Sequence, residues 1–333
     1  MARRNLRDYF VIDVEPHIMP SLEDISYFPG VKRINEGIGR LIKDWIGPDA
    51  KVEDLPKSWS ADDLIAAMDE GGVDMACALP EEFMDTSWDA RRWSTNGWVL
   101  AQCEKYPDRL IFQSNVGPIM KRGVEHAIWE LEYLVKEKGN RITKVYAPGD
   151  GYINDPRMWP FYKKCVELGV IVTMHTGAAH VPPSFTKYTH PLLLDDICLA
   201  FPDLKIIAFH FGWPWREILN HMAQKHPNLY ISVSGNIGRL SHAPRLAAEW
   251  IGEALYFAGA DRIIFGYDWP VTIPKACVNT IINLEIPEDL QKGYGYPPIT
   301  EYDKRKILGL NLAKLLGGKA EEMARKKLGP LFK

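Results

Sequence analysis

The sequence predicts an α/β protein, and more narrowly a (β/α)8 TIM barrel that forms one domain over residues 1–333. Two observations predict this fold. Eight short apolar runs, rich in β-branched and aromatic residues, recur along the chain, and segments with helical patterning lie between them. Nearly continuous apolarity is typical of parallel strands that are buried on both faces. The eight runs are 9–14, 73–79, 110–116, 142–147, 170–175, 205–210, 229–234 and 262–268.

The segments between these runs carry helix signals. Segment 60–72 opens with Ser60 as a candidate N-cap, has acidic residues in its first turn and ends in two glycines. Segment 123–140 repeats apolar residues at helical spacing on one face. Strands that alternate with helices favour a closed barrel over an open sheet. The other expected helices are 155–169, 191–203, 214–228 and 244–261.

Two segments fall outside the repeat. Residues 18–59 are too many for an ordinary strand-to-helix loop, so we expect an insertion that lies over the C-terminal mouth of the barrel as a lid or an oligomer contact. It contains a candidate helix over 33–47. Residues 270–333 form a C-terminal extension. Its Pro- and Gly-rich part is expected to return across the same face, to be followed by a closing helix at 304–317 and a solvated basic tail.

Composition limits the function classes. The chain has 40 basic and 43 acidic residues and a formal charge of −3, which argues against nucleic-acid binding and against a basic membrane-binding surface. No apolar run is long enough to span a bilayer, and the N-terminal stretch lacks the pattern of a secretory signal. The cysteines lie far apart without a CxxC pair, which predicts reduced, buried thiols in a cytoplasmic protein. They are Cys77, Cys103, Cys165, Cys198 and Cys277.

Polar side chains follow the apolar runs at the point where several strands end. Glu15 and His17 follow the first run, His175 ends the fifth, His210 ends the sixth and Asp268 ends the eighth. In a barrel these ends meet on one face, where active sites lie. One such histidine is usually structural and one such aspartate is usually a helix cap. Together they predict a divalent metal site for Zn²⁺, Mn²⁺ or Fe²⁺.

The motifs around these residues resemble a known superfamily. "DVEPH", "MHTG", "FHFGWP" and "IIFGYDWP" are similar to motifs of the amidohydrolase superfamily, and of its branch with amino-carboxymuconate-semialdehyde decarboxylase and γ-resorcylate decarboxylase. The resemblance covers about residues 10–270. The first motif is Glu-x-His rather than His-x-His, as in several of those decarboxylases. The resemblance implies that Glu15, His17, His175 and Asp268 are metal ligands, and that His210 is a further ligand or an acid/base.

The resemblance implies a metal-dependent enzyme that carries out non-oxidative decarboxylation of an aromatic or unsaturated carboxylic acid, with His210 and Asp268 as catalytic residues. Imidazole titrates near neutrality, which suits proton transfer to such a substrate. Three alternatives stay open. The same ligands suit a hydrolase of amides, esters or lactones. Some relatives hold two metals and activate oxygen. A barrel that binds metal only as a partner subunit is the non-enzyme alternative, and it predicts an incomplete ligand set.

Two residues near the predicted mouth are candidates for substrate binding. Arg239 follows the seventh run, and its guanidinium can pair with a substrate carboxylate. Trp213 follows the sixth run, where an aromatic wall would suit a planar substrate, as would Trp215 and Trp269. A surface arginine and ordinary helix packing explain these residues about as well.

The remaining candidates have weaker positions. In some branches of the superfamily a carboxylated lysine at the end of strand four bridges two metals. Lys144 lies in that strand but before its end, so a second metal is an alternative. Four residues in loops near the mouth are better explained as solvated. A small-molecule substrate and a homodimer are the expected partners. The four loop residues are Glu81, Glu82, His180 and His190.

Overall fold

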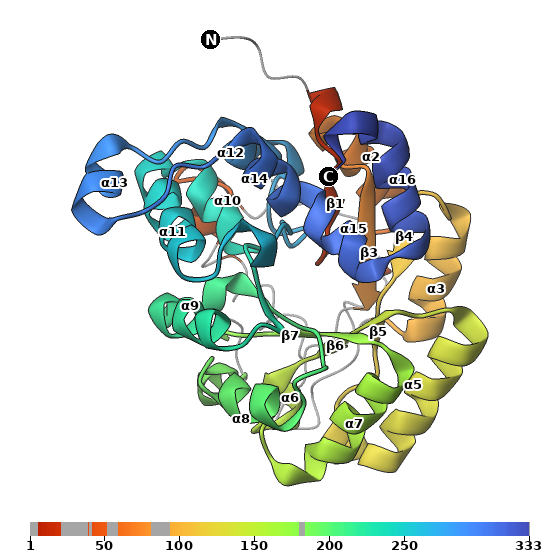
Figure 1. Ribbon diagram of the computed structural model, residues 1–333. Coiled ribbons are helices and arrows are strands. Elements are labelled where there is room, and N and C mark those ends of the chain that lie inside the picture. Colours follow the sequence, from red (N-terminus) through yellow and green to blue (C-terminus); the bar gives the residue numbers. More distant parts are fainter. Residues whose placement is uncertain are drawn as a thin grey trace.

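The computed structural model describes residues 6–20, 39, 42–51, 59–80, 94–179 and 184–332. All eight expected strands are present, in the expected order, and neighbouring strands run parallel. A short extra strand, β2, continues the first strand segment after a break. Helices surround the strands on the outside (Figure 1). The strands are β1 (Ile12–Asp13), β2 (His17–Ile18), β3 (Met75–Pro80), β4 (Leu110–Phe112), β5 (Ser114–Asn115), β6 (Ile142–Val145), β7 (Ile171–Met174), β8 (Ile206–Ala208), β9 (Leu229–Ser232) and β10 (Ile263–Ile264).

The strands form a ring. β1 and β2 pair with β3, β3 pairs with β4, and β5 to β10 pair in sequence order. β4 and β5 are consecutive parts of one segment, which joins the two groups. Across the seam between the first and last strands, the Val14 amide donates to the Phe265 carbonyl at 3.3 Å and the His17 amide donates to the Trp269 carbonyl at 2.9 Å. The predicted barrel is confirmed.

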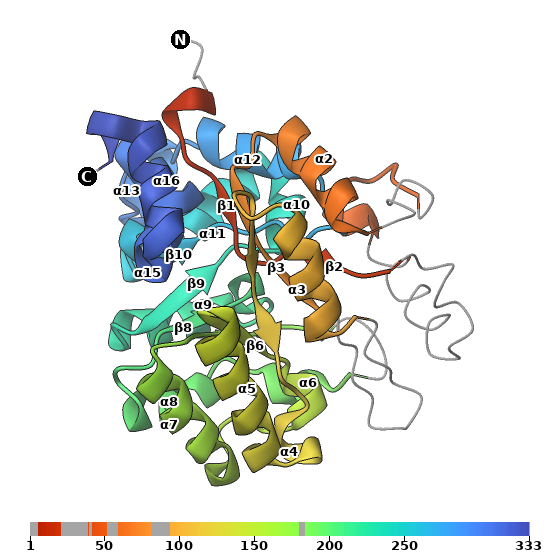
Figure 2. The ribbon, with the colours of Figure 1, turned by 90° about the vertical axis from the view of Figure 1, so that its right-hand side faces the viewer.

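The expected helices are also present, and their caps explain where they begin and end. The Ser60 side chain accepts from the Asp63 amide at the start of α2, and Gly72 ends the helix with a φ of 72°. Figure 2 shows α2 and α3 beside the strands β1 and β3. The helices are α2 (Ala61–Gly71), α3 (Asn96–Lys105), α4 (Ile119–Arg122), α5 (Val124–Lys138), α6 (Ala147–Asp150), α7 (Trp159–Leu168), α8 (Leu193–Ala200), α9 (Arg216–Lys225), α10 (Asn236–Ser241), α11 (Pro244–Phe257), α12 (Pro274–Asn283), α13 (Glu288–Tyr294), α14 (Glu301–Arg305), α15 (Asn311–Leu316) and α16 (Gly318–Leu328).

Most of the insertion at 18–59 lies outside the described residues. Its two ends meet, because Met19 and Trp59 form an antiparallel bridge. The described part at residues 42–51 includes Trp45, and its carbonyl oxygen lies directly against Gly238 in α10, where it leaves no room for a Cβ. Since α10 follows β9 at its C-terminal end, this part of the insertion lies at the mouth of the barrel. Its role as a lid or an oligomer contact stays a prediction.

The C-terminal extension differs from expectation in its tail. The Pro- and Gly-rich part contains α12 and α13, and α12 packs beside α2, where Pro274 Cβ lies 2.7 Å from the position of a Cβ on Gly71. The tail was expected to be solvated, and that prediction is wrong. It forms helix α16, which buries Ala320, Ala324 and Leu328 on one face. The closing helix is confirmed as α14 and α15, joined by a π-helical turn over Lys306–Leu310.

The structure agrees with two predictions made from the composition, on the cysteines and on membrane-spanning segments. All five cysteines are buried and free, as predicted. Among the described residues, no helix has both the length and the apolarity needed to cross a bilayer.

Candidate metal centre

The polar residues predicted from the strand ends do lie at the C-terminal ends of the strands. Glu15 and His17 stand on the segment from β1 to β2. His175 directly follows β7, and His210 follows β8 at the start of a 3-10 turn, η5 (His210–Gly212). Asp268 follows β10 by four residues. Parallel strands in a ring bring these ends to one rim.

Three of the five side chains form one compact cluster. The ligand atoms of Glu15, His17 and Asp268 all lie within 4.8 Å of one another. His17 Nε2 is 3.7 Å from Glu15 Oε1 and 3.4 Å from Asp268 Oδ1. The Glu15 side chain is fully buried, whereas that of Asp268 is 16% exposed. The cluster therefore has a buried side and a side that a small molecule can reach.

His175 and His210 lie beside this cluster as a pair. His210 Nε2 is 3.0 Å from His175 Nδ1, and His210 Nδ1 is 3.7 Å from Glu15 Oε2. Burial lowers the pKa of both imidazoles below the usual value for histidine. Neutral imidazole is the form that binds a metal ion. The structure thus joins His210 directly to Glu15, and joins His175 to the cluster through His210.

Lys144 also lies in the site, which its position before the end of β6 did not predict. Its ammonium is buried, 2.9 Å from Glu15 Oε1 and 3.3 Å from His17 Nε2. Two carboxylates and one ammonium leave a formal charge of −1 when the imidazoles are neutral. Excess negative charge in a mostly buried cluster is costly unless a cation compensates it. Oxygen and imidazole nitrogen donors suit Zn²⁺, Mn²⁺ and Fe²⁺, so the residues fit a divalent ion.

The backbone at two of these residues is in a conformation that side chains rarely adopt. The φ angle is 60° at His210 and 63° at Asp268. Such conformations cost of the order of 1–3 kcal/mol each and collect at functional sites. Gly235 lies against both residues, since a Cβ there would come within 3.0 Å of Asp268 Oδ2 and of His210 Nδ1. The local backbone is therefore shaped around these two side chains.

Several contributing residues were missed at the level of sequence. Ser234 Oγ donates to Glu15 Oε2 at 2.5 Å, and the Asn236 amide group donates to the His210 carbonyl at 2.8 Å. Asp13 Oδ1 accepts from the backbone amides of Glu15 and Tyr267, each at 3.0 Å. Burial raises the pKa of Asp13 to about 7, against the effect of these two amides. The only available signal for Asp13 was an acidic residue inside an apolar strand.

The predicted substrate residues lie together, and the Trp213 amide donates to the His210 carbonyl at 3.0 Å. The Arg239 guanidinium lies 5.5 Å from the centre of the Trp213 ring and 5.9 Å from that of Trp250. Among the described residues, no carboxylate contacts Arg239. The imidazole of His190 packs at 4.5 Å against Trp215. The remaining loop candidates, Glu81, Glu82 and His180, lie outside the described residues.

Comparison with known proteins assigns the family. A family model described as "Amidohydrolase" matches residues 12–318, so the chain belongs to the amidohydrolase family. One curated relative is 2-amino-3-carboxymuconate-6-semialdehyde decarboxylase of Caenorhabditis elegans. It is 22% identical and covers 92% of this chain and 94% of its own.

Solved structures share the fold. An uncharacterised TIM-barrel protein of Bordetella bronchiseptica is 21% identical, covers 93% of this chain and 99% of its own, and has a TM-score of 0.66. A 5-carboxyvanillate decarboxylase of Novosphingobium aromaticivorans with bound manganese is 17% identical (93% and 97% covered, TM-score 0.65). A dihydroxybenzoic acid decarboxylase of Polaromonas sp. JS666, with manganese and 2-nitroresorcinol, is 19% identical (96% and 99% covered, TM-score 0.61).

Proposed function

We propose that this chain is a metal-dependent decarboxylase that acts on an aromatic or unsaturated carboxylic acid. The observation that carries the proposal is the meeting of Glu15, His17 and Asp268 at one rim of the barrel, with the two histidines beside them. Relatives over nearly the whole chain are named as decarboxylases of such acids, and two of those reported above bind manganese.

We assign the metal to Glu15, His17, His175 and Asp268, with His210 as a further ligand or as the acid/base. A divalent ion bound there supplies a Lewis acid that polarises a substrate oxygen. Mn²⁺, Zn²⁺ and Fe²⁺ all suit these ligands, and manganese is favoured by the relatives. The partly exposed side of the cluster is where the substrate has access.

The chain's own residues account for proton movement. His210 delivers a proton to the ring carbon that carries the carboxylate, the bond from that carbon to the carboxylate breaks, and its electrons return to the ring as CO₂ leaves. Asp268 holds the ion, and in the hydrolytic alternative it accepts a proton from water. Arg239 pairs with a substrate carboxylate, and Trp213 forms a wall beside the planar ring.

One alternative to the decarboxylase is an oxygenase with two metal ions. Lys144, 2.9 Å from Glu15, is the observation that keeps a second metal and oxygen chemistry open. We also propose a homodimer and, from the reduced buried cysteines, a cytoplasmic location.

Metal analysis combined with a CO₂ assay tests the function. We expect one equivalent of Mn or Zn per chain and CO₂ release from hydroxybenzoates without oxygen. Dialysis against a chelator should abolish release, and Mn²⁺ should restore it. Acid release from esters or lactones without CO₂ would instead indicate a hydrolase. Two metals with iron and consumption of oxygen would indicate an oxygenase.

His175→Ala tests the ligand assignment. The variant should lose bound metal and turnover while keeping the far-UV circular dichroism of the folded barrel, because only a side chain at the rim is removed. His221→Asn, an exposed position on α9, is the matched control and should change neither. An active variant at position 175 with a full equivalent of metal would refute the assignment.

His210→Asn separates a ligand from an acid/base. If His210 is the acid/base, metal content stays near one equivalent and turnover falls by about 10²-fold or more. If metal and turnover are both lost, His210 is a ligand.

A further inference from the structure

Asp13 lies in the barrel wall two residues before Glu15. Its side chain is fully buried, and one oxygen, Oδ1, accepts two backbone hydrogen bonds. The donors are the amide of Glu15 and the amide of Tyr267, each at 3.0 Å. A buried oxygen that accepts from two backbone amides connects two segments of the main chain through one side chain.

These two amides belong to the two sides of the proposed metal site. Glu15 is itself a ligand, and Tyr267 directly precedes Asp268. Asp13 and Tyr267 are 254 positions apart in sequence. They meet because the first and last strands close the barrel at this seam. One carboxylate oxygen therefore connects the backbone of one ligand to the backbone next to another.

Along the seam, Asp13 accepts hydrogen bonds at a level between two backbone–backbone hydrogen bonds. Below it, the Val14 amide bonds to the Phe265 carbonyl, and above it the His17 amide bonds to the Trp269 carbonyl. Between these two bonds, the side chain of Asp13 takes the amides of Glu15 and Tyr267. The distance between the two strands at the level of the ligands is thus set by a side chain, which a substitution can remove.

Gly266 shows that the last strand passes close to this carboxylate. A Cβ at position 266 would lie 3.2 Å from Asp13 Oδ1, 3.0 Å from Val14 Cγ1 and 3.0 Å from Ser234 Cβ. These distances are tighter than ordinary carbon contacts. A residue without a side chain at 266 is therefore what allows Asp13 to reach the Tyr267 amide.

We propose that Asp13 is a positioning residue that sets the separation of Glu15 and Asp268 across the barrel seam, and through it the affinity for the divalent ion. The part that concerns affinity rests on the proposed function. The connection of the two amides does not, and it can be measured without metal. Groups that orient the ligands of a metal typically change its affinity 10- to 100-fold when they are removed.

The first experiment follows amide hydrogen exchange in the full chain without metal. Asp13→Ala removes the acceptor, so exchange should rise about tenfold at peptides with Glu15 and Tyr267, and little elsewhere. Asp13→Asn keeps an acceptor oxygen and should retain most of the protection. Protection of both peptides in Asp13→Ala would overturn the proposal. Loss of protection in Asp13→Asn equal to that in Asp13→Ala would also overturn it.

The second experiment measures the Kd for Mn²⁺ by calorimetry. Asp13→Ala should raise Kd at least about tenfold and Asp13→Asn less than about threefold. Cys77→Ala in β3 removes buried volume beside β1 but leaves the acceptor Asp13 and both amides in place, so it controls for lower barrel stability and should stay within about threefold of the unmodified chain. If Asp13→Ala does not fold, Gly266→Ala presses on the same oxygen and should also raise Kd.

The outcomes separate the two proposals. If the unmodified chain does not bind Mn²⁺ or Zn²⁺, the proposed function fails, and hydrogen exchange alone decides whether Asp13 connects the strands. If the unmodified chain binds Mn²⁺ and Asp13→Ala binds it equally well, the proposed function stands and the inference on Asp13 fails. An equal rise in Kd for Cys77→Ala would assign the effect to general destabilisation and overturn the inference.

Discussion

Glu15 shows how single residues create the charge of this site. Burial opposes its ionisation, but the His210 imidazole, the Lys144 ammonium and the His17 imidazole together outweigh burial and lower the pKa of this carboxyl below its usual range. A carboxyl with a depressed pKa stabilises the fold above its unfolded pKa, and this contribution is lost as the pH falls through the folded value. At neutral pH Glu15, a proposed metal ligand, is therefore ionised although it is buried.

Lys144→Met tests how much of this state depends on the ammonium. Methionine keeps most of the volume but leaves the buried Glu15 carboxylate without its 2.9 Å partner. Removing one partner of a buried ion pair typically costs about 3–5 kcal/mol, so the metal-free variant should unfold at lower temperature. Mn²⁺ should restore more of the Tm than it adds to the unmodified chain, because the ion replaces the lost charge. A variant that fails to bind Mn²⁺ would show instead that Lys144 helps to hold the metal.

Which site residues were predictable depends on what defines them. The meeting of five side chains at one rim was predictable because a polar residue after an apolar run marks the end of a strand; their roles as ligands stay a proposal. The five residues are Glu15, His17, His175, His210 and Asp268. Asp13 and Ser234 were missed because their roles depend on partners 254 and 219 positions away. The sequence contains no pattern that states such a pairing. Only the closed ring brings them together.

At the scale of elements, the turn from β9 into α10 shapes the rim. Gly235 has a φ of 66°, and a Cβ there would lie 3.0 Å from both Asp268 Oδ2 and His210 Nδ1. Gly235→Ala should therefore displace these groups and raise the Kd for Mn²⁺ by about tenfold or more. Gly139→Ala is the matched control, since Gly139 has a φ of 68° and open space around it. Gly139 is in the left-handed helical region with a ψ of 21°, so Gly139→Ala should lose about 1–2 kcal/mol of stability. Gly235 has a ψ of −65°, outside that region, so Gly235→Ala should lose more, and calorimetry should find weaker metal binding only in Gly235→Ala.

Elements were predictable where local chemistry decides them. Helix α2 begins after Ser60 and ends at Gly72, as the capping rules predict. The prediction of a solvated tail was wrong because α16 has only three buried residues in a mostly charged sequence. They are Ala320, Ala324 and Leu328. Two of them are alanines, which give a weak apolar signal. This helix is stabilised by the surface on which it packs, and the sequence of the helix does not describe that surface.

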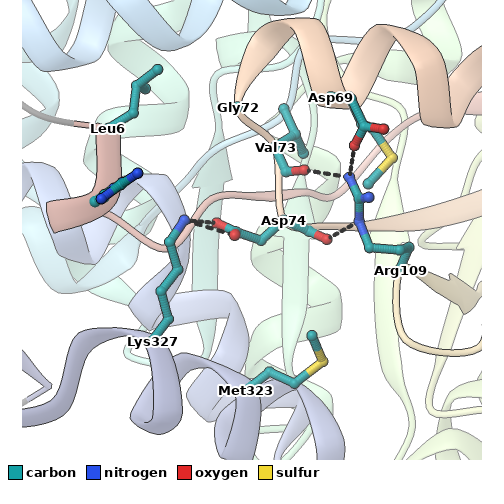
Figure 3. A pocket seen from close by; sticks show the side chains of 10 residues that line it. Leu6, Asp69, Gly72, Val73, Asp74, Arg109, Met323 and Lys327 are labelled. Atoms are coloured by element: carbon teal, nitrogen blue, oxygen red, sulfur yellow. Dashed lines mark hydrogen bonds and ion pairs between the residues drawn. The ribbon is translucent and has the colours of Figure 1, made fainter.

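At the scale of the whole molecule, α16 packs over the end of the barrel opposite the candidate metal centre. The 3-10 helix η1 (Leu6–Asp8) lies beside α16 (Figures 1 and 2). Between η1, α2 and α16 lies a cleft of about 400 Å³ (Figure 3). Asp74, just before β3, accepts from Lys327 of α16 at 2.7 Å and from the Val11 amide at 2.8 Å. This carboxylate joins the C-terminal helix to the start of the first strand.

Comparing two variants shows how much this junction stabilises the barrel. Lys327→Ala removes only a partly exposed ion pair and should cost at most about 1 kcal/mol. Asp74→Ala also leaves the Val11 amide without its acceptor and should cost about 1.5–3 kcal/mol. Unfolding in urea should therefore show a larger loss of free energy of unfolding for Asp74→Ala than for Lys327→Ala. Because the junction lies at the N-terminal ends of the strands, both variants should keep the Mn²⁺ affinity of the unmodified chain. Equal losses of stability would mean that the bond from Val11 contributes nothing, and a weaker affinity would mean that the two ends of the barrel are coupled.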